Sequence, residues 1–262
     1  MRVTFDSNVW EDVVCPERCA ANRKCHEQAL LVRKSLEAGQ VTGFFCEAWT
    51  TLEAVMKKDR PDFLAKQAIE SRLVETIQSD GTTDMAVFMG PNQSRRPPLP
   101  PKFEVRLSEA IALGMRLLMV PRLSELDLPT DFYAPQTERI ARQTAKVLHA
   151  IEERGVGRAQ IRAFGLELAR RHACSGCFSD IPDVPFCDDD RKKIVLLVAE
   201  WADGEAVAAH VGYGNDLFCS EDCNCTHSGT PSVLDPKNRQ WLREEFRVQF
   251  VDLGKLAEML TT

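Results

Sequence analysis

Short apolar runs of β-type residues alternate along this chain with segments whose apolar residues recur at helical spacing. Arg2–Phe5 predicts a strand that stops at the polar run Asp6–Asn8, because these residue types favour turns and helix caps. Over 24–38 the apolar residues lie near helical spacing, and Gly39 follows. This pattern predicts a helix that ends at the glycine.

The rest of the chain continues the alternation. Strands are predicted at 40–46, 85–89, 115–120, 217–219 and 248–251, and a further strand is predicted to end near residue 78. Helices are predicted at 48–58, from 61 onward, and at 106–113, 136–172 with a break at Gly155, 188–210, 238–246 and 253–260. Pro97–Pro101 predicts an extended surface connector. Strands that alternate with helices predict an α/β fold with a parallel sheet.

Four acidic residues stand where such a fold would bind a ligand. Asp6 and Asp222 each follow a short strand, Glu53 lies on the helix after the second strand, and Asp203 interrupts the apolar part of the helix at 188–210. Ligands of open parallel sheets bind at the carboxyl ends of the strands. Converging carboxylates raise one another's pKa unless a cation offsets their charge. Ligation by oxygen alone favours Mg²⁺ or Mn²⁺.

The four acids belong to four motifs that follow one another along the chain. The motifs are FDSNVW at Phe5–Trp10, TTLEAV at Thr50–Val55, WADGEAVAAH at Trp201–His210 and GNDLFCSED at Gly214–Asp222. In this order they resemble the four acidic motifs of the PIN-domain nucleases, over roughly 1–60 and 188–255. The resemblance implies that the catalytic, metal-binding carboxylates are Asp6, Glu53, Asp203 and Asp222.

The resemblance also implies a three-layer α/β/α fold around a central, mainly parallel sheet. Residues 1–79 and 188–262 would form the two parts of this core. Residues 80–187 would form a largely helical insertion that carries the proline-rich connector and the basic helices.

Two alternatives within the expected site stay open. Glu47 could take the place of Glu53, and Asp216 competes with Asp203 as the third acid, so that Asp216 is also a candidate metal ligand. Polar neighbours of the acids are expected to hold the strand-end turns and orient the carboxylates rather than contact substrate. These neighbours are Ser7, Asn8 and Ser220. His210 is expected to be a packed or surface histidine rather than a catalytic one.

The activity implied by the resemblance is metal-dependent hydrolysis of phosphodiester bonds, usually in single-stranded RNA. The formal net charge of −6 argues against a protein that coats nucleic acid nonspecifically. Residues 136–172, however, hold eight basic and four acidic side chains. This segment is predicted to face the RNA backbone, although a solvated helix face explains its charge as well. The residues concerned are Arg139, Arg142, Lys146, Arg154, Arg158 and Arg162.

Other functions remain as alternatives. A PIN fold could bind RNA or a protein without hydrolysis, or act as a toxin with an antitoxin-like partner, although the length of the chain argues against a toxin. A homodimer is also left open. No apolar run reaches the roughly 18 residues of a membrane helix, and the first residues carry charge where a signal peptide would be apolar. The sequence therefore predicts a cytoplasmic protein with no membrane partner.

Ten cysteines fall into clusters. In a chain without a secretion signal, reduced thiols are expected rather than a disulfide framework. Cys174 and Cys177 could supply half of a tetrahedral zinc site, but no second pair stands at the usual spacing. Buried or loop thiols are therefore the prediction.

Overall fold

A computed structural model describes residues 1–66, 69–77, 82–91, 99–120, 128–174, 180–222 and 231–261. Within these residues, five strands form a parallel sheet in the order β5-β2-β1-β6-β7. They are β1 (Arg2–Phe5), β2 (Thr42–Cys46), β5 (Arg116–Leu118), β6 (Leu217–Cys219) and β7 (Phe250–Val251). The predicted parallel α/β sheet is confirmed.

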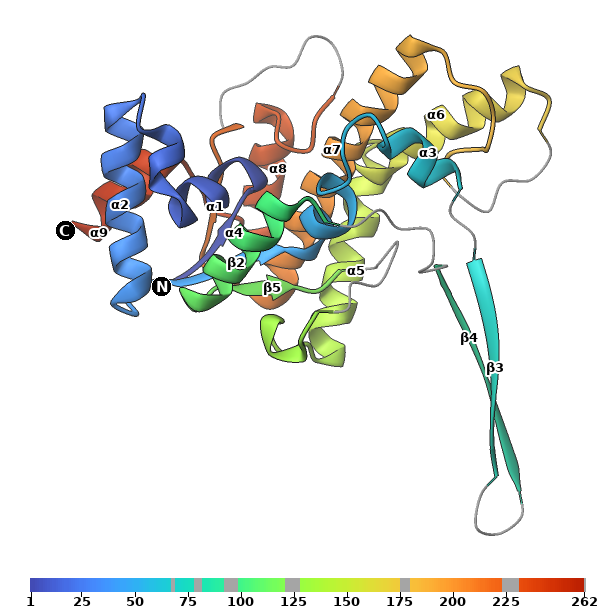
Figure 1. Ribbon diagram of the computed structural model, residues 1–262, viewed down its shortest axis with the longest axis horizontal. Helices are drawn as coiled ribbons and strands as arrows, with labels where there is room; N and C mark the ends of the chain where they lie inside the picture. The colour runs from blue at the N-terminus through green and yellow to red at the C-terminus, as the bar shows by residue number, and fades with distance from the viewer. Residues whose placement is uncertain are drawn as a thin grey trace.

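Helices pack against the sheet as two groups. One group contains α1 (Ser7–Val14), α2 (Arg23–Glu37), α4 (Pro101–Ala112) and α9 (Leu253–Leu260), and the other contains α5 (Glu138–Glu153), α6 (Arg158–Arg171) and α7 (Asp188–Tyr213) (Figure 1). The remaining helical elements are η1 (Pro16–Cys19), η2 (Trp49–Glu53), α3 (Arg60–Ala65), η4 (Thr130–Phe132) and α8 (Pro236–Phe246). Val3, Thr4 and Phe5 are all buried, as expected for a strand covered on both faces.

The order of the strands fixes where a ligand site can form. From β1 the chain moves outward to β2 and then β5, and after α7 it returns to β6 on the other side of β1 before moving on to β7. The direction of winding therefore reverses between β1 and β6. The carboxyl ends of these two strands form the topological switch point, where open α/β sheets bind ligands.

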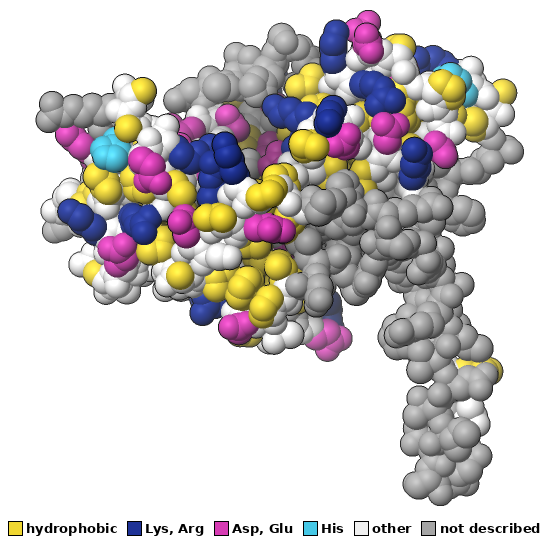
Figure 2. Space-filling model, viewed as in Figure 1, with side chains coloured by type: hydrophobic (Ala, Val, Ile, Leu, Met, Phe, Trp, Pro, Cys, Tyr) yellow, Lys and Arg dark blue, Asp and Glu magenta, His cyan; other side chains and the backbone are white. Residues whose placement is uncertain are grey.

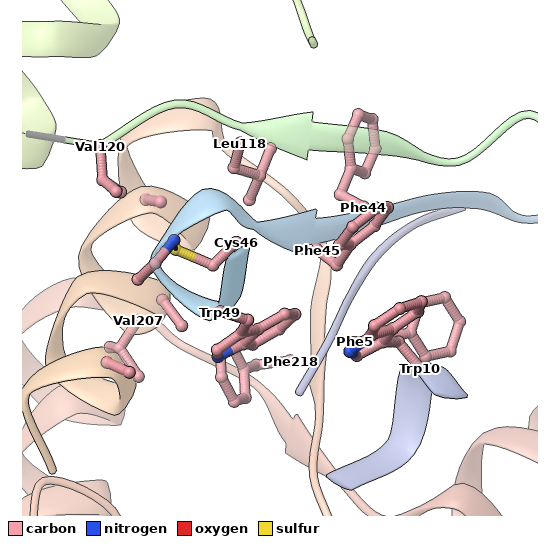
Figure 3. Close-up of a cluster of buried hydrophobic side chains, with 14 of the residues drawn as sticks. Phe5, Trp10, Phe44, Phe45, Cys46, Trp49, Leu118, Val120, Val207 and Phe218 are labelled. Carbon is pink, nitrogen blue, oxygen red and sulfur yellow. Dashed lines mark hydrogen bonds between the residues drawn. The ribbon is translucent and has the colours of Figure 1, made fainter. Parts of the chain in front are cut away.

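Stacked aromatic rings join the sheet to α1 and η2. The Phe45 ring stacks on Trp10 with ring centroids 5.0 Å apart and lies parallel to Trp49 at 6.4 Å (Figure 3). All three side chains are almost completely buried. Since α1 begins directly after Asp6 and η2 ends at Glu53, this packing holds the two segments that carry acidic residues against one face of β2.

The structure agrees with most predicted elements and departs from the prediction at three places. Residues 7–14 form α1, a helix that was not predicted, although residues of the types at 6–8 favour turns and helix caps. Asp6 caps this helix by accepting a hydrogen bond from Ser7 N. The helix expected at 48–58 is the five-residue π-helix η2. Strands β3 (Ile69–Ile77) and β4 (Thr83–Pro91) form a separate antiparallel hairpin that projects from the body (Figure 1).

The segment 80–187 contributes to the main body of the protein. Its strand β5 pairs with β2 and forms one edge of the sheet, and its helix α5 packs along α7. The two helices expected at 136–172 are present as α5 and α6, with Gly155 and Gly157 between them. Of the expected proline connector, 97–98 lie outside the described residues, and Pro101 begins α4. Within the described part of the chain, no helix has both the length and the apolar character that a membrane span requires.

Gly165 permits the close packing of α6 on residues 180–181. A Cβ atom at this position would lie 1.8 Å from the carbonyl oxygen of Asp180, which is backbone and cannot rotate away. Gly165→Ala should therefore destabilise the protein by about 1–3 kcal/mol, although alanine favours an exposed helix by about 1 kcal/mol. Thermal unfolding measures this effect. Leu166→Ala, at the exposed neighbouring position, is the control and should stay within about 0.5 kcal/mol of the wild type.

Candidate active site

Asp6 lies at the carboxyl end of β1, at the switch point of the sheet. Its side chain is completely buried. One carboxylate oxygen accepts a hydrogen bond from Ser7 N at 2.7 Å, and the other accepts one from the Ser220 hydroxyl at 2.5 Å. Asp6 N donates to the carbonyl oxygen of Cys219 at 2.8 Å. Groups from the ends of β1 and β6 thus fix the orientation of this carboxylate.

Glu53 ends the π-helix η2 and approaches Asp6 from the side of β2. The Ser7 hydroxyl hydrogen-bonds to its carboxylate, so Ser7 contacts Asp6 through its backbone and Glu53 through its side chain. Burial raises the pKa of Glu53, and the charges of Arg60 and Lys57 partly offset this effect. The buried guanidinium of Arg60 also donates to the carbonyl oxygens of Glu53 and Val55, at 2.6 and 3.0 Å.

Asp203 and Asp222 complete the group. Burial raises the pKa of Asp203 well above its usual range, and the charges of Asp6, Glu53 and Asp222 raise it further. Asp222 follows β6, and its backbone N–H donates to the Ser220 hydroxyl at 3.1 Å. The structure therefore brings Asp6, Glu53, Asp203 and Asp222 into one electrostatic neighbourhood, which we call the acidic cluster.

The acidic cluster is unfavourable when all its members are ionised. Burial, together with the charges of Asp222 and Glu53, raises the pKa of Asp6 to about 7, even though Ser220 and Ser7 donate hydrogen bonds to it. Like charges in a poorly solvated place raise one another's pKa in this way. A divalent cation would remove the repulsion and lower these pKa values.

The donor set suits a hard cation that keeps part of its water shell. All four candidate ligands offer carboxylate oxygens, which Mg²⁺ and Mn²⁺ prefer. Among the described residues, no three of these acids place ligand atoms within 4.8 Å of one another. A cation here would therefore be held by one or two carboxylates directly and by the others through water, as is usual for Mg²⁺.

The three polar residues expected beside the acids all make contacts at this edge of the sheet. Ser7 and Ser220 hydrogen-bond to the acids as described above. Asn8 accepts a hydrogen bond from Glu221 N at 3.2 Å and so ties the start of α1 to the chain after β6. These contacts orient the carboxylates and hold the two strand ends together.

The two alternative acids lie outside the acidic cluster. Glu47 is buried and accepts a hydrogen bond from the Tyr133 hydroxyl at 2.9 Å, and its charge acts on Tyr213 and Cys46. Asp216 is exposed and accepts a hydrogen bond from Arg2 N at 2.7 Å. Arg2 begins β1, so Asp216, the alternative metal ligand, lies at the amino ends of the strands, whereas Asp6 lies at their carboxyl ends.

His210 is buried within the core rather than exposed to the acidic cluster. Its Nδ1 lies 2.9 Å from the Thr4 hydroxyl, and its ring packs edge-on against Phe218. Burial lowers the pKa of His210 to about 3, so the ring is neutral at physiological pH. The packed histidine expected from the sequence is what the structure contains.

Three of the cations expected to face RNA lie on α5, beside the C-terminal part of α7. Gly212 of α7 packs against Ile140 and Thr144 of α5, so Arg139 and Arg142 lie beside the C-terminal end of α7. Nine residues of helix, or about 13 Å, separate Gly212 from Asp203. Arg139, Arg142 and Lys146 are exposed, and Arg142 pairs with Glu138 on its own helix.

The other three expected cations are engaged in structural contacts. Arg154 stacks over Trp241 and hydrogen-bonds to Asn238, whereas Arg158 and Arg162 both pair with Asp180. Such contacts leave these side chains less able to bind a phosphate backbone. The expectation that 136–172 supplies the substrate surface therefore has little support in the geometry.

A different basic surface adjoins the acidic cluster. A groove of about 670 Å³ lies between the turn after η2 and the first half of α7, lined by Lys57, Lys58, Arg191, Lys192, Val195 and Leu196. We call it the basic groove. Figure 2 shows Lys and Arg side chains beside hydrophobic ones over the region of α3 and α7. The pairs Lys57-Lys58 and Arg191-Lys192 were visible in the sequence, but only the fold brings them together.

The basic groove leads toward the acidic cluster from two sides. The charge of Lys57 acts on Glu53. On α7, Lys192, Leu196 and Asp203 recur at spacings that place them on one helix face, over about 16 Å. Arg191 is anchored there by two hydrogen bonds to Asp62, at 3.1 and 3.3 Å.

Comparisons with known proteins do not assign this site. The chain matches no protein-family model, no curated protein and no solved structure.

Proposed function

We propose that this protein is a PIN-like, metal-dependent endoribonuclease that hydrolyses phosphodiester bonds of single-stranded RNA. The observation that carries the proposal is the meeting of Asp6, Glu53, Asp203 and Asp222 at the switch point of a parallel sheet. These are the four acids of the four ordered motifs. Residues 53 and 203 are separated by 150 positions in the sequence, so chance packing of surface acids does not readily explain their interaction.

The residues of the acidic cluster would bind the cation and set its position. Asp6 is the best-oriented ligand, since two hydrogen bonds fix its carboxylate. Bound Mg²⁺ or Mn²⁺ supplies an activated water and stabilises charge on the leaving oxygen. Ser220 donates to the Asp6 carboxylate and accepts from the backbone N–H of Asp222. Ser7 contacts the carboxylates of Asp6 and Glu53, so the two serines tie these three residues together. Neither serine is required as a nucleophile.

The basic groove offers a path for the substrate backbone. Lys57 and Lys58 can contact phosphates, and Val195 and Leu196 offer apolar surface to bases or sugars. Arg191 and Lys192 also line the groove and pair there with Asp62 and Asp189, so a phosphate would compete with these two acids. The roughly 16 Å from Lys192 to Asp203 along α7 corresponds to a few nucleotides. A strand bound in the groove would therefore run toward the acids.

The test is a cleavage assay on end-labelled RNA. We expect Mn²⁺ or Mg²⁺ to support cleavage of a single-stranded substrate and EDTA to abolish it. A folded, RNA-binding protein that cleaves no substrate with either ion would contradict the proposal and favour a noncatalytic binding fold. Duplex RNA and single-stranded DNA of the same sequence show how selective the site is.

Removing charge from the basic groove should weaken RNA binding. We expect the triple variant Lys57→Gln, Lys58→Gln, Lys192→Gln to reduce the slope of log affinity against log salt by about 2, since each phosphate contact to a single strand contributes about 0.7. Binding is measured by fluorescence anisotropy at several salt concentrations. An Asp6→Asn background prevents cleavage during the titration.

The matched control removes three exposed cations from α5. Arg139→Gln, Arg142→Gln, Lys146→Gln changes the net charge by the same amount but lies beside the opposite end of α7. Its salt slope should stay within error of the unmodified background. If the control variant shows the reduced slope of log affinity against log salt and the groove variant does not, the RNA binds along α5 and not in the basic groove.

A further inference from the structure

A second group of metal-ligating side chains lies away from the acidic cluster, where the chain turns from α1 into α2. Ligand atoms of Asp12, Cys19 and Cys25 all lie within 4.8 Å of one another. Asp12 is on α1, Cys19 ends η1 and Cys25 is in the first turn of α2. Three consecutive elements thus each contribute one ligand atom, and all three side chains are partly accessible to solvent.

The surrounding contacts hold these three groups in place. The Cys19 thiol donates to the carbonyl oxygen of Pro16 at 3.2 Å, and Cys25 N donates to the side chain of Asn22, the N-cap of α2, at 3.3 Å. Arg18 pairs with one oxygen of Asp12 at 3.5 Å, so the other oxygen can face the thiols. Cys19 and Cys25 are both free thiols.

We propose that Asp12, Cys19 and Cys25 bind a thiophilic divalent cation, with Zn²⁺ the best match. Zinc takes thiolate ligands at about 2.3 Å and carboxylate oxygens at about 2.0–2.2 Å in a tetrahedral arrangement. These lengths require ligand atoms that lie about 3.5–3.8 Å apart. The three ligand atoms lie within 4.8 Å of one another, so shifts of about 1 Å bring them to this spacing.

Charge and donor type separate this site from the acidic cluster. Two thiolates and one carboxylate exceed the charge of Zn²⁺ by one. Arg18 lies beside them and pairs with both Asp12 and Glu11, and Arg106 pairs with Glu11 as well, so the two arginines balance the charge of Glu11 and the excess at the site. Soft thiolates select Zn²⁺ over Mg²⁺ and Mn²⁺, which favour oxygen. Three protein ligands leave the fourth tetrahedral position for water.

A cation at this place would clamp the end of α1 to the start of α2. At its N-terminal end, α1 begins with Ser7, which hydrogen-bonds to two members of the acidic cluster. The metal would therefore stabilise the helix that positions Ser7 without taking part in the chemistry at the acids.

The test is a Co²⁺ titration of the reduced, metal-free chain. Thiolate ligation gives a charge-transfer absorption in the near ultraviolet that carboxylates do not produce. We expect saturation at one equivalent, displacement by Zn²⁺ and no displacement by Mg²⁺. Cys19→Ser and Cys25→Ser should each weaken binding by more than about 100-fold, beyond the effect of losing an outer contact. Asp12→Asn should weaken binding while the thiolate band persists at high Co²⁺.

The matched control is Cys15→Ser. Cys15 lies four residues before Cys19, but its thiol donates to Glu109 instead of joining the group. Its Co²⁺ spectrum and affinity should equal those of the wild type. Absence of the band in the reduced wild type, or its survival in Cys25→Ser, would overturn the proposal. So would a Cys19–Cys25 disulfide that forms in air at the same rate with and without Zn²⁺.

Discussion

Replacing Asp6 by asparagine will lower the rate of metal-dependent RNA cleavage by at least about 100-fold, since even the loss of a contact behind a metal ligand costs 10–100-fold. Asp6 is the one member of the acidic cluster whose two carboxylate oxygens both accept hydrogen bonds in the described structure, from Ser7 N and the Ser220 hydroxyl. It is also completely buried. The change removes a charge and leaves the shape of the site intact. The measurement is kcat on a single-stranded substrate at saturating Mn²⁺.

The same substitution should not destabilise the metal-free protein. Asparagine can still accept the hydrogen bond from Ser7 N, and its amide can donate to the Ser220 hydroxyl. The folded state raises the pKa of Asp6 to about 7 from an ordinary value of 3.8, so ionising the buried carboxyl opposes folding at neutral pH. The variant, which never ionises, should unfold in EDTA at a temperature equal to or above that of the wild type.

Asp216→Asn provides the control for charge removal. Asp216 carries the same group at the opposite end of the strands, where an asparagine oxygen can still accept from Arg2 N. Its kcat should remain within about twofold of the wild type, a difference of about 0.4 kcal/mol in the barrier. Equal losses in Asp6→Asn and Asp216→Asn would place the catalytic metal elsewhere.

Hydrophobic patterning predicted the parts of the fold in which periodicity dominates. The strands at Arg2–Phe5 and Leu217–Cys219 and the helix at Leu253–Leu260 have the predicted bounds. Helix α1 was missed because Asp6 reads equally well as a turn residue and as an N-cap. The π-helix at 49–53 was not predicted from the hydrophobic spacing. Here the hydroxyls of Thr50 and Thr51 both donate to the carbonyl oxygen of Glu47, and apolar periodicity carries no information about such contacts.

The motifs predicted which acids interact but not where the cations lie. Each motif acid follows a strand or lies on a helix, and the local sequence pattern predicts these strands and helices. The basic groove depends instead on how the turn after η2 packs against α7, a contact between residues more than 130 positions apart. Counting charges along the sequence therefore favoured α5 and α6, where Arg154, Arg158 and Arg162 are engaged in structural contacts.

Mn²⁺ should stabilise the wild type strongly at pH 8 and much less at pH 5.5. A ligand at 100 times its dissociation constant adds about 2.7 kcal/mol, which for a protein of this size raises the melting temperature by roughly 5–10 °C. The pKa of Asp6 is raised to about 7, so the carboxyl is protonated at pH 5.5 in the metal-free fold and the cation must displace that proton. At pH 8 the Asp6 carboxyl is mostly ionised, so its proton competes much less.

The pH dependence without metal follows from the same shift. Between pH 4 and pH 7 the unfolded chain ionises Asp6 while the folded chain does not, so this group's contribution to stability falls as pH rises and levels off above about 7. The stability of Asp6→Asn relative to the wild type should therefore increase over this window in EDTA. Thermal unfolding of both proteins from pH 4 to pH 8 measures the difference.

The variant Glu205→Gln distinguishes loss of metal binding from the general effect of removing a buried acid on stability. Burial raises its pKa to about 7 as well, but its carboxylate accepts a hydrogen bond from Trp201 Nε1 at 2.9 Å and faces Arg158 rather than the acidic cluster. Glu205→Gln should therefore change the pH dependence in EDTA in the same direction as Asp6→Asn, yet keep the full gain from Mn²⁺ at pH 8. Asp6→Asn should lose most of that gain. If Asp6→Asn gains as much from Mn²⁺ as Glu205→Gln does, the cation is held by groups other than the acidic cluster.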